Sequence, residues 1–297
     1  MSRLIAVPNV SEGRDEAAIS RYAEEISSAG ASVLDVHADP THNRSVYTVA
    51  GPTDALIEGT IRLAVACSKI DLSTHVGIHP RLGGLDVCPY VPHTGSMDEA
   101  IAAARAAGRS IYERAALPVY LYGEAALRAD TRELPQLRRG GLGTLKQRAN
   151  GGLAPDHGTT SEIDFRRGVV CVGARGVLIA FNVWLRCERR AAEEIAAAVR
   201  KGGGDRGAGL PGLRALGLAI SPGVSQVSMN IVDPELTSID QAFQAVALNA
   251  ELRKIPIVHT ELVGLVPERY QPDPNAAAAR LLTEPGRSLE AALVGNA

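Results

Sequence analysis

The sequence has no long apolar segment and no excess of charge of one sign. Its longest apolar stretch, Val177 to Leu185, is about half of the ~20 residues that a membrane-spanning helix requires, so we expect no membrane partner. The first residues, MSRLIAVPNVSEGR, lack the apolar core and the small-residue cleavage site of a signal peptide. A formal net charge of -2 leaves no broad basic surface for nucleic-acid phosphates, so nucleic acid is not an expected partner either.

Cysteine is also scarce. The four cysteines, Cys67, Cys88, Cys171 and Cys187, are scattered without CxxC spacing. They predict reduced, mostly buried thiols in the cytoplasm rather than a disulfide framework or a zinc site. The overall composition, 45% hydrophobic and 22% charged residues over 297 positions, argues against disorder and suffices for one large domain or two small ones with real cores.

Apolar runs and Ala/Glu-rich runs alternate in the same order twice. In the first half this periodicity predicts strand 4–8, helix 15–29, strands 32–38 and 44–50, helix 53–69 and strand 85–90. In the second half it predicts strand 177–185, helix 188–201, strands 213–220 and 224–232, helix 236–253 and strand 256–265. Each half therefore follows the order βαββαβ, which is the ferredoxin-like arrangement of a sheet with two helices on one face.

The repeated order predicts an α+β fold with two ferredoxin-like subdomains, residues 1–176 and 177–297. Each sheet needs cover on its second face, which favours subdomains that face a groove, where small-molecule sites often lie. The expected helix N-caps are Ser11, Thr53 and Asp233.

An insertion separates the two repeats. It is predicted to contain a helix near 97–115, a strand at 118–122, a helix near 135–147 and a strand at 168–173. The polar segment 150–167 is a candidate ligand loop, because loops beyond ~12–15 residues without structure of their own are often functional. The Gly-rich segment 202–209 follows a helix instead of opening one, which favours a connector over a phosphate cradle.

The densest polar cluster is THVGIHPR at residues 74–81. His79 can titrate near neutral pH, Pro80 fixes the local backbone, and Arg81 carries a planar fork that suits a carboxylate. This combination is typical of a catalytic or binding site, and the alternative is a surface loop whose histidine only hydrogen-bonds.

A metal site is a weaker hypothesis for the same segment. His75 and His79 have the spacing of a helical metal pair, and His37 and His42 offer further nitrogen ligands. However, a glycine between the pair and a proline after it oppose a continuous helix, and no HExxH glutamate is present. We therefore expect no metal.

A second polar cluster, DVHADPTHNR at residues 35–44, occupies the predicted turn between two strands. Asp35, His37, Asn43 and Arg44 are suited to orienting a small dicarboxylate. Hairpin turns also collect Asp, Asn and Pro for conformational reasons, so a purely structural turn is the alternative. Composition and spacing thus predict a polar site near 35–44 and 75–81, and they name no reaction.

Six segments carry a family resemblance. They are PNVSEGR (8–14), DPTHNRSVYTVAGP (39–52), GIHPRLGGLDVCPY (77–90), PVYLYGEAA (118–126), VLIAFNVWL (177–185) and ELVGLVP (261–267). In this order they resemble the formiminotransferase family over about residues 3–270, and the chain ends before a cyclodeaminase domain. The resemblance implies two ferredoxin-like subdomains around a folate-binding groove, and a cytoplasmic homodimer.

The resemblance also implies a reaction. Members of the family transfer a formimino group from N-formimino-L-glutamate to the co-substrate tetrahydrofolate, in histidine degradation and one-carbon metabolism. The family's acid/base histidine falls on His79. The resemblance also implies that Arg44, Arg81 and Arg138 bind carboxylate groups of the substrates. His37 and Asn43 complete the expected substrate-binding residues, and those expected to bind folate are Gly158, Thr160, Arg166, Arg167 and Gly168.

Two features differ from the family pattern. His37 stands where the mammalian members carry an aspartate, so a second imidazole is available to tune His79 or to alter substrate choice. The segment 157–168 is more charged and about one residue longer than the family's folate loop, which is rich in glycine, proline and serine.

Two other functions stay open. A paralogous enzyme would move a formyl or formimino group between other amines, and loss of folate binding with His79 retained would favour it. A non-catalytic folate- or amino-acid-binding module would bind folate tightly without turnover. In that module, replacing His79 with alanine would change no measured function.

Overall fold

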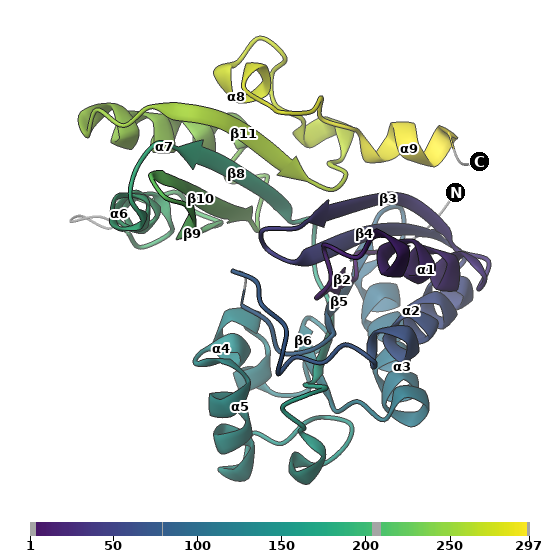
Figure 1. The fold of residues 1–297 in the computed structure, drawn as a ribbon. Coiled ribbons are helices and arrows are strands. Elements are labelled where there is room, and N and C mark those ends of the chain that lie inside the picture. The colour runs from purple at the N-terminus through teal and green to yellow at the C-terminus, as the bar shows by residue number, and fades with distance from the viewer. Residues whose placement is uncertain (1–3, 79, 204–208, 296–297) are drawn as a thin grey trace. The chain divides into compact units, whose positions relative to one another are not determined.

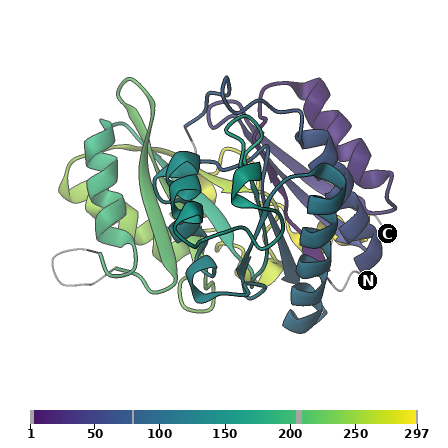
Figure 2. The same cartoon turned by 90° about the horizontal axis from the view of Figure 1, so that it is seen from below.

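The computed structural model of this protein describes residues 4–78, 80–203 and 209–295. The chain divides into two units, one that ends at Arg175 and one that runs from Gly176 to Gly295. Each unit combines helices with a β-sheet, so the predicted α+β class is confirmed (Figure 1, Figure 2). His79 and most of the predicted connector 202–209 lie outside the described residues.

The first unit contains one mixed sheet and its covering helices. Its elements are β1 (Leu4–Ala6), β2 (Asn9–Val10), α1 (Glu16–Ser27), β3 (Ser32–Asp39), β4 (Arg44–Gly51), α2 (Thr53–Cys67), β5 (Leu85–Pro92), α3 (Met97–Ala115), β6 (Val119–Gly123), η1 (Ala129–Thr131), α4 (Leu134–Arg138), α5 (Gly141–Asn150), η2 (Thr160–Glu162) and β7 (Val170–Ala174). The short strands β1 and β2 both lie between β4 and β5, and β3 pairs with the other edge of β4. On the far side of β5, β7 and then β6 extend the sheet in parallel.

The two faces of this sheet are covered differently. Helices α1, α2 and α3 pack on one face, where Tyr47, Leu56 and Ile111 belong to a single apolar core. On the opposite face a second core joins Tyr120 and Leu145, and it belongs to β5, β6, β7 and the segment that contains α4 and α5. This second core contains no residue of β3 or β4.

The second unit repeats the strand–helix order on a smaller sheet. Its elements are β8 (Ile179–Leu185), α6 (Arg189–Val199), β9 (Leu213–Ser221), β10 (Val224–Ile231), α7 (Ile239–Leu252), β11 (Ile257–Val263), η3 (Glu268–Tyr270), α8 (Ala277–Arg280) and α9 (Leu289–Gly295). All neighbouring strands are antiparallel in the order β11–β8–β10–β9. Gly217 of β9 allows α6 to approach closely, because a Cβ atom there would collide with the backbone of Glu193.

Most predicted elements occur where the periodicity placed them, and two are corrected. The predicted strand 4–8 is interrupted, because Pro8 has no N–H group for the ladder and the chain resumes as β2. The predicted helix 135–147 is two helices, since Gly140 takes a left-handed backbone conformation with φ 77° between them.

The predicted helix caps were wrong. Asp15 caps α1 by accepting a hydrogen bond from the N–H of Ala18, and Ser238 caps α7 in a capping box with Gln241. Helix α2 begins at Thr53 itself, one residue earlier than a capping role would require. Among the described residues, no helix is long and apolar enough to cross a membrane.

Candidate functional site

A buried carboxylate organises one end of β5 in the first unit. Asp86 is fully buried, and its Oδ2 atom accepts hydrogen bonds from Nη1 of Arg44 at 2.7 Å and from Nη2 of Arg138. Its Oδ1 atom accepts the backbone N–H of Leu82 at 2.8 Å. Arg44 begins β4 and Arg138 ends α4, so a hairpin strand, a second strand of the same sheet and an insertion helix together build the site.

The two guanidinium groups keep Asp86 ionised. Burial alone would raise the pKa of Asp86, but the charges of Arg138 and Arg44 outweigh burial and hold this pKa at about 2. Burial lowers the pKa of Arg44, Asp86 opposes that change, and the nearby cations Arg138 and Arg81 add to it. Because buried charges need partners, the three groups stabilise one another only as a set.

Positive charge exceeds negative charge in this cluster. Arg44, Arg81 and Arg138 lie close enough to interact electrostatically, and Asp86 is the carboxylate that they share. The Nε atom of Arg138 is buried and has no hydrogen-bond partner among the described residues. A surplus of buried cations attracts an anion, and a planar guanidinium group binds a carboxylate through two parallel hydrogen bonds.

Arg81 is held by two histidines of the predicted site. Its Nη1 atom contacts the ring of His75, and its Nη2 atom donates to the backbone carbonyl of His42 at 3.2 Å. Burial and then the charge of Arg81 lower the pKa of His75, so this imidazole is neutral near pH 7. A neutral ring can lie against the guanidinium group without charge repulsion.

Asn43 shapes the turn that leads into Arg44. Its backbone has a positive φ of 48°, and asparagine tolerates that conformation better than most residues. Its Oδ1 atom accepts the N–H of Gly13 at 2.9 Å, and its Nδ2 atom donates to the carbonyl of Val76 at 3.0 Å. Asn43 therefore fixes the positions of segments 8–14 and 74–81 relative to the turn.

His37 lies half-buried on β3, on the same sheet face as Arg44. His37 lies directly opposite Val46 on β4, and Val46 is two residues from Arg44 on the same strand. Opposite residues, and residues two apart on one strand, have their side chains on the same face of the sheet. The sequence cluster 35–44 is thus brought to the face that carries the arginines.

The candidate ligand loop is joined to the end of the 74–81 cluster. Val169 donates its N–H to the carbonyl of Leu82 at 2.8 Å, and Gly168 forms a β-bridge with Gly83. A side chain at either glycine would collide with the facing backbone, so both positions require glycine. Two motifs that are ~80 residues apart in the sequence are therefore neighbours in the first unit.

The loop itself is ordered by local hydrogen bonds. Gly158 has a φ of 95° and Thr160 begins the short helix η2. Arg166 donates through Nε and Nη2 to Oδ2 of Asp71 at 3.0 and 2.7 Å, and Arg167 donates to the carbonyl of Ala115 at 2.5 Å. Both arginines thus have partners within the first unit.

Sequence reasoning missed two residues of the cluster. Asp86 was passed over inside the apolar strand LDVCPY, and Asn9 was not singled out although its Oδ1 atom accepts Nη2 of Arg44 at 2.9 Å. A single charged residue inside an otherwise apolar strand was the available signal, because such a residue is rarely buried without a partner. The proposed metal pair lies partly outside the described residues, since it includes His79.

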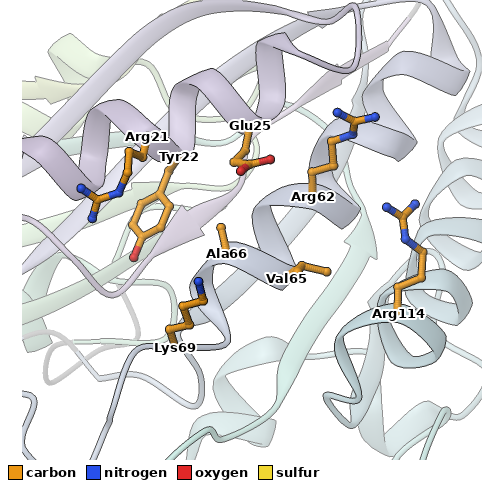
Figure 3. A pocket seen from close by; sticks show the side chains of 8 residues that line it. All are labelled: Arg21, Tyr22, Glu25, Arg62, Val65, Ala66, Lys69 and Arg114. Atoms are coloured by element: carbon orange, nitrogen blue, oxygen red, sulfur yellow. The ribbon is translucent and has the colours of Figure 1, made fainter.

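A separate pocket of about 520 Å³ lies on the helical side of the first unit (Figure 3). It is lined by Arg21, Tyr22, Glu25, Arg62, Val65, Ala66, Lys69 and Arg114. Glu58 binds both Arg62 and Arg114, so the positive charge of the pocket is partly neutralised. It contains none of the predicted site residues, and its cations are more exposed than those around Asp86. The cluster around Asp86 is therefore the candidate site.

The structure defines an α+β protein whose first unit holds a cation-rich cluster around Asp86. Residues 3–175 match the family model described as the formiminotransferase domain, N-terminal subdomain, and residues 180–273 match the model described as the formiminotransferase domain. The chain belongs to the formiminotransferase family, as its six sequence segments predicted.

Three relatives illustrate the extent of the similarity. The chain is 39% identical over 283 residues to a formimidoyltransferase-cyclodeaminase of Gallus gallus, covering 92% of this chain and 52% of that protein. It is 32% identical to a glutamate formimidoyltransferase of Streptococcus pyogenes serotype M1, covering 91% of each chain. It is 35% identical to a glutamate formimidoyltransferase of Thermoplasma acidophilum, covering 91% of this chain and 89% of that one. The chain thus spans about half of the first relative and about nine-tenths of the other two.

Proposed function

We propose that this protein transfers the formimino group of N-formimino-L-glutamate to tetrahydrofolate, with His79 as the general acid and base. The observation that carries the proposal is the set of three arginines around the single carboxylate of Asp86 in a member of the formiminotransferase family. Formiminoglutamate is a dicarboxylate, and it supplies the negative charge that this cluster lacks.

The chemistry requires one proton to move between two nitrogens. The N5 nitrogen of tetrahydrofolate attacks the amidine carbon, a new N5–C bond forms, and the bond from that carbon to the glutamate nitrogen breaks. His79 removes the proton from N5 and delivers it to the departing nitrogen, so glutamate leaves as a neutral amine. A histidine is suited to both steps because its ordinary pKa lies near neutral pH.

A direct test of the activity uses the acid-stable product of the transfer. Purified protein is incubated with formiminoglutamate and tetrahydrofolate, the mixture is acidified, and the absorbance of 5,10-methenyltetrahydrofolate is measured. Formation of this product that depends on both substrates is the expected result. Folded protein that binds tetrahydrofolate but forms no product with formiminoglutamate would contradict the proposed donor and favour a paralogue with another amine.

Arg138 is proposed to bind a carboxylate of formiminoglutamate. We expect Arg138→Met to raise the KM for formiminoglutamate about 10- to 100-fold, because hydrogen bonds to charged groups contribute about 1.5–3 kcal/mol. The kcat should change much less, since Arg138 binds a part of the substrate that does not react. Arg139→Met is the matched control, because Arg139 is exposed on the next residue of the chain. Equal KM values for the two variants would contradict the assignment.

Arg44 and Arg81 are proposed to bind the substrate together with Arg138, while Asn43 and His37 orient it. This assignment is supported by the hydrogen bonds of Asn43 to segments 8–14 and 74–81 and by the position of His37 on the face of Arg44. Arg44 and Arg138 both hold Asp86, so replacement of either one would disturb folding as well as binding. Arg138 is the less buried of the two, with 17% of its side chain exposed against 10% for Arg44, and is therefore the more informative position to test.

The loop 157–168 is proposed to bind folate through Gly158, Thr160, Arg166, Arg167 and Gly168. We expect the double variant Arg166→Ala/Arg167→Ala to weaken the binding of polyglutamylated tetrahydrofolate more than that of the monoglutamate, by roughly 2- to 30-fold. This range follows from about 0.2–1 kcal/mol for each exposed ion pair. The double variant Arg189→Ala/Arg190→Ala on α6 is the control, because both arginines are exposed there. If the double variant weakened the binding of both folates equally, the loop would not bind the polyglutamate tail.

Two structural predictions also belong to this proposal. The strand order β11–β8–β10–β9 with two helices on one face supports a ferredoxin-like arrangement for the second unit, and β5, β1/β2, β4 and β3 support the same core in the first. The division of the chain after Arg175 supports the subdomains 1–176 and 177–297. That the protein acts as a cytoplasmic homodimer stays a prediction.

A further inference from the structure

The pocket on the helical side of the first unit has no part in the proposed function (Figure 3). Its volume of about 520 Å³ falls in the ~300–1,000 Å³ range of small-molecule sites. Its lining residues belong to α1, to α2 and the residues just after it, and to α3. The whole pocket therefore lies within the first unit, and its chemistry is set by these helices alone.

Positive charge exceeds negative charge around this pocket. Its lining contains one carboxylate, that of Glu25, and four cations, which are Arg21, Arg62, Lys69 and Arg114. Glu58, which binds Arg62 and Arg114, supplies a second carboxylate. The cations thus outnumber the carboxylates by two, and a ligand with two negative charges would balance them.

The two ends of the pocket differ in how their cations are paired. At one end, Arg114 donates through both Nη atoms to the carboxylate of Glu58, and Nε of Arg62 donates to the same carboxylate at 2.8 Å. At the other end, Arg21 and Lys69 form no ion pair within the described part of the chain (Figure 3). The uncompensated charge therefore lies at the end with Arg21 and Lys69.

Tyr22 adds an unused hydrogen-bond donor at the same end. It is 8% exposed, yet its hydroxyl group has no hydrogen-bond partner among the described residues. The hydroxyl groups of Tyr47 and Tyr120, by contrast, donate to the carbonyls of Ile19 at 3.1 Å and of Leu153 at 2.8 Å. Burial raises the pKa of Tyr22, so its hydroxyl keeps the proton that it can donate. Because a buried tyrosine hydroxyl usually has a partner, this one indicates an acceptor on a ligand.

An apolar surface lies between the two ends. It is formed by Val65 and Ala66 of α2, and Val65 is 39% exposed although its side chain is apolar (Figure 3). Covering this surface with an apolar group stabilises a complex in proportion to the area removed from water. The pocket is thus better suited to an anion with an organic part than to a bare inorganic ion.

We infer that this pocket binds an organic phosphate monoester, with the phosphoryl group between Arg21, Lys69 and the hydroxyl of Tyr22. The organic part lies against Val65 and Ala66. A phosphate monoester carries about −1.5 to −2 charges at pH 7 and three strong acceptor oxygens, which match the two unpaired cations and the hydroxyl donor. A carboxylate offers one charge and two oxygens. The inference does not rest on the proposed function, because it uses no residue of the candidate site.

The binding test uses phenyl phosphate, titrated into the unaltered protein at pH 8 by isothermal titration calorimetry. Phenyl sulfate has the same shape with one charge fewer, and inorganic phosphate lacks the ring. Phenyl phosphate should bind about tenfold more tightly than either competitor. Failure of phenyl phosphate to bind would overturn the inference. Equal binding of inorganic phosphate, or tighter binding of the dicarboxylate phenylmalonate, would overturn the ligand class.

A variant of Tyr22 separates recognition from stability. Tyr22→Phe removes only the hydroxyl oxygen, and it should raise the Kd for phenyl phosphate about tenfold, since a hydrogen bond to a charged group is lost. The midpoint of urea unfolding should stay the same, because the hydroxyl has no partner in the folded chain. Tyr47→Phe is the matched control. It loses the hydrogen bond to Ile19, so it should lower the urea midpoint and leave the Kd unchanged. An unchanged Kd in Tyr22→Phe would contradict the assigned donor.

A variant of Lys69 tests the charge at the same end of the pocket. We expect Lys69→Met to raise the Kd for phenyl phosphate about tenfold, because a charge-assisted hydrogen bond is lost. Lys201→Met is the matched control. Lys69 and Lys201 are both exposed and both lie one residue beyond a helix C-cap, Ser68 for α2 and Arg200 for α6. If the two variants bound phenyl phosphate equally well, the phosphate would bind elsewhere on the protein and the inference would be wrong.

Discussion

Replacing His79 with alanine should lower kcat by about 10²- to 10⁴-fold, the usual contribution of a general acid or base. Without the imidazole, the proton of N5 has no acceptor at the moment of attack, and the glutamate nitrogen has no donor at the moment of departure. Both steps then depend on water. The Kd for tetrahydrofolate and the midpoint of thermal unfolding should change little, because the proposed role of the imidazole is to move a proton during the reaction and not to bind folate or stabilise the fold. The measurement is the rate of 5,10-methenyltetrahydrofolate formation after acid quench, at saturating concentrations of both substrates.

His93→Ala is a suitable control for this prediction, since His93 follows the end of β5 that is opposite to Asp86. It should keep the unaltered rate. Added imidazole should restore part of the activity of His79→Ala and none in a protein whose loss is structural. A His79→Ala protein with full kcat would remove His79 from the mechanism, and the neutral imidazole of His75 beside Arg81 would become the next residue to test.

Local periodicity was enough to place most helices and strands. The predicted helix near 97–115 is found as α3, Met97–Ala115, because its small apolar residues repeat with helical spacing and Ser96 with Glu99 forms a capping box. Such signals act within a few residues. They are therefore present in the sequence whatever the rest of the chain does.

The predicted cap at Ser11 was wrong, and its side chain has a distant partner. The hydroxyl of Ser11 donates to the carbonyl of Gly83, 72 residues away, at 2.8 Å, and is not available to cap α1. The cap falls to Asp15, which is the residue just before the helix. Ser11 also lies before the predicted start of the helix at residue 15, whereas an N-cap directly precedes the first helical residue.

The candidate site was predicted only in part, because it joins distant segments of the chain. The arginines were named from motifs, but the carboxylate that brings them together was not, since Asp86 lies 42 residues from Arg44 and 52 residues from Arg138 in the chain. The contact of the 157–168 loop with Gly83 is likewise set by the sheet. Pairing between strands decides which polar residues meet, and a pattern along the chain does not encode it directly.

The Asp86→Asn variant should destabilise the first unit by about 3–5 kcal/mol at pH 7, the usual cost of breaking a buried ion pair by removing one partner. Asparagine keeps the size of the side chain and retains an oxygen that accepts the N–H of Leu82. The loss therefore reports mainly on the buried charges of Arg44 and Arg138, which have no replacement for the carboxylate. Urea unfolding followed by far-UV circular dichroism is the measurement, because the single tryptophan lies in the second unit.

Glu58→Gln is the matched control for Asp86→Asn. Glu58 also binds two arginines, Arg62 and Arg114, but its side chain is 33% exposed. Exposed ion pairs contribute about 0.2–1 kcal/mol, so the control should lose far less stability than Asp86→Asn. Equal losses in the two variants would contradict the view that burial makes the Asp86 cluster costly to break.

The pH dependence of this difference follows from the pKa of Asp86. The folded protein holds that pKa at about 2, below the ordinary value of 3.8, so ionised Asp86 stabilises the folded state above about pH 4. This contribution, about 2 kcal/mol at ~1.4 kcal/mol per pKa unit, is lost as the pH falls from about 4 to about 2. The gap in unfolding free energy between the unaltered protein and Asp86→Asn should therefore be constant from pH 7 to about 4 and shrink below that. If the gap already shrinks between pH 7 and 5, a group other than Asp86 is titrating. If the gap stays constant down to pH 2, the arginines do not lower the pKa of Asp86 in the folded protein.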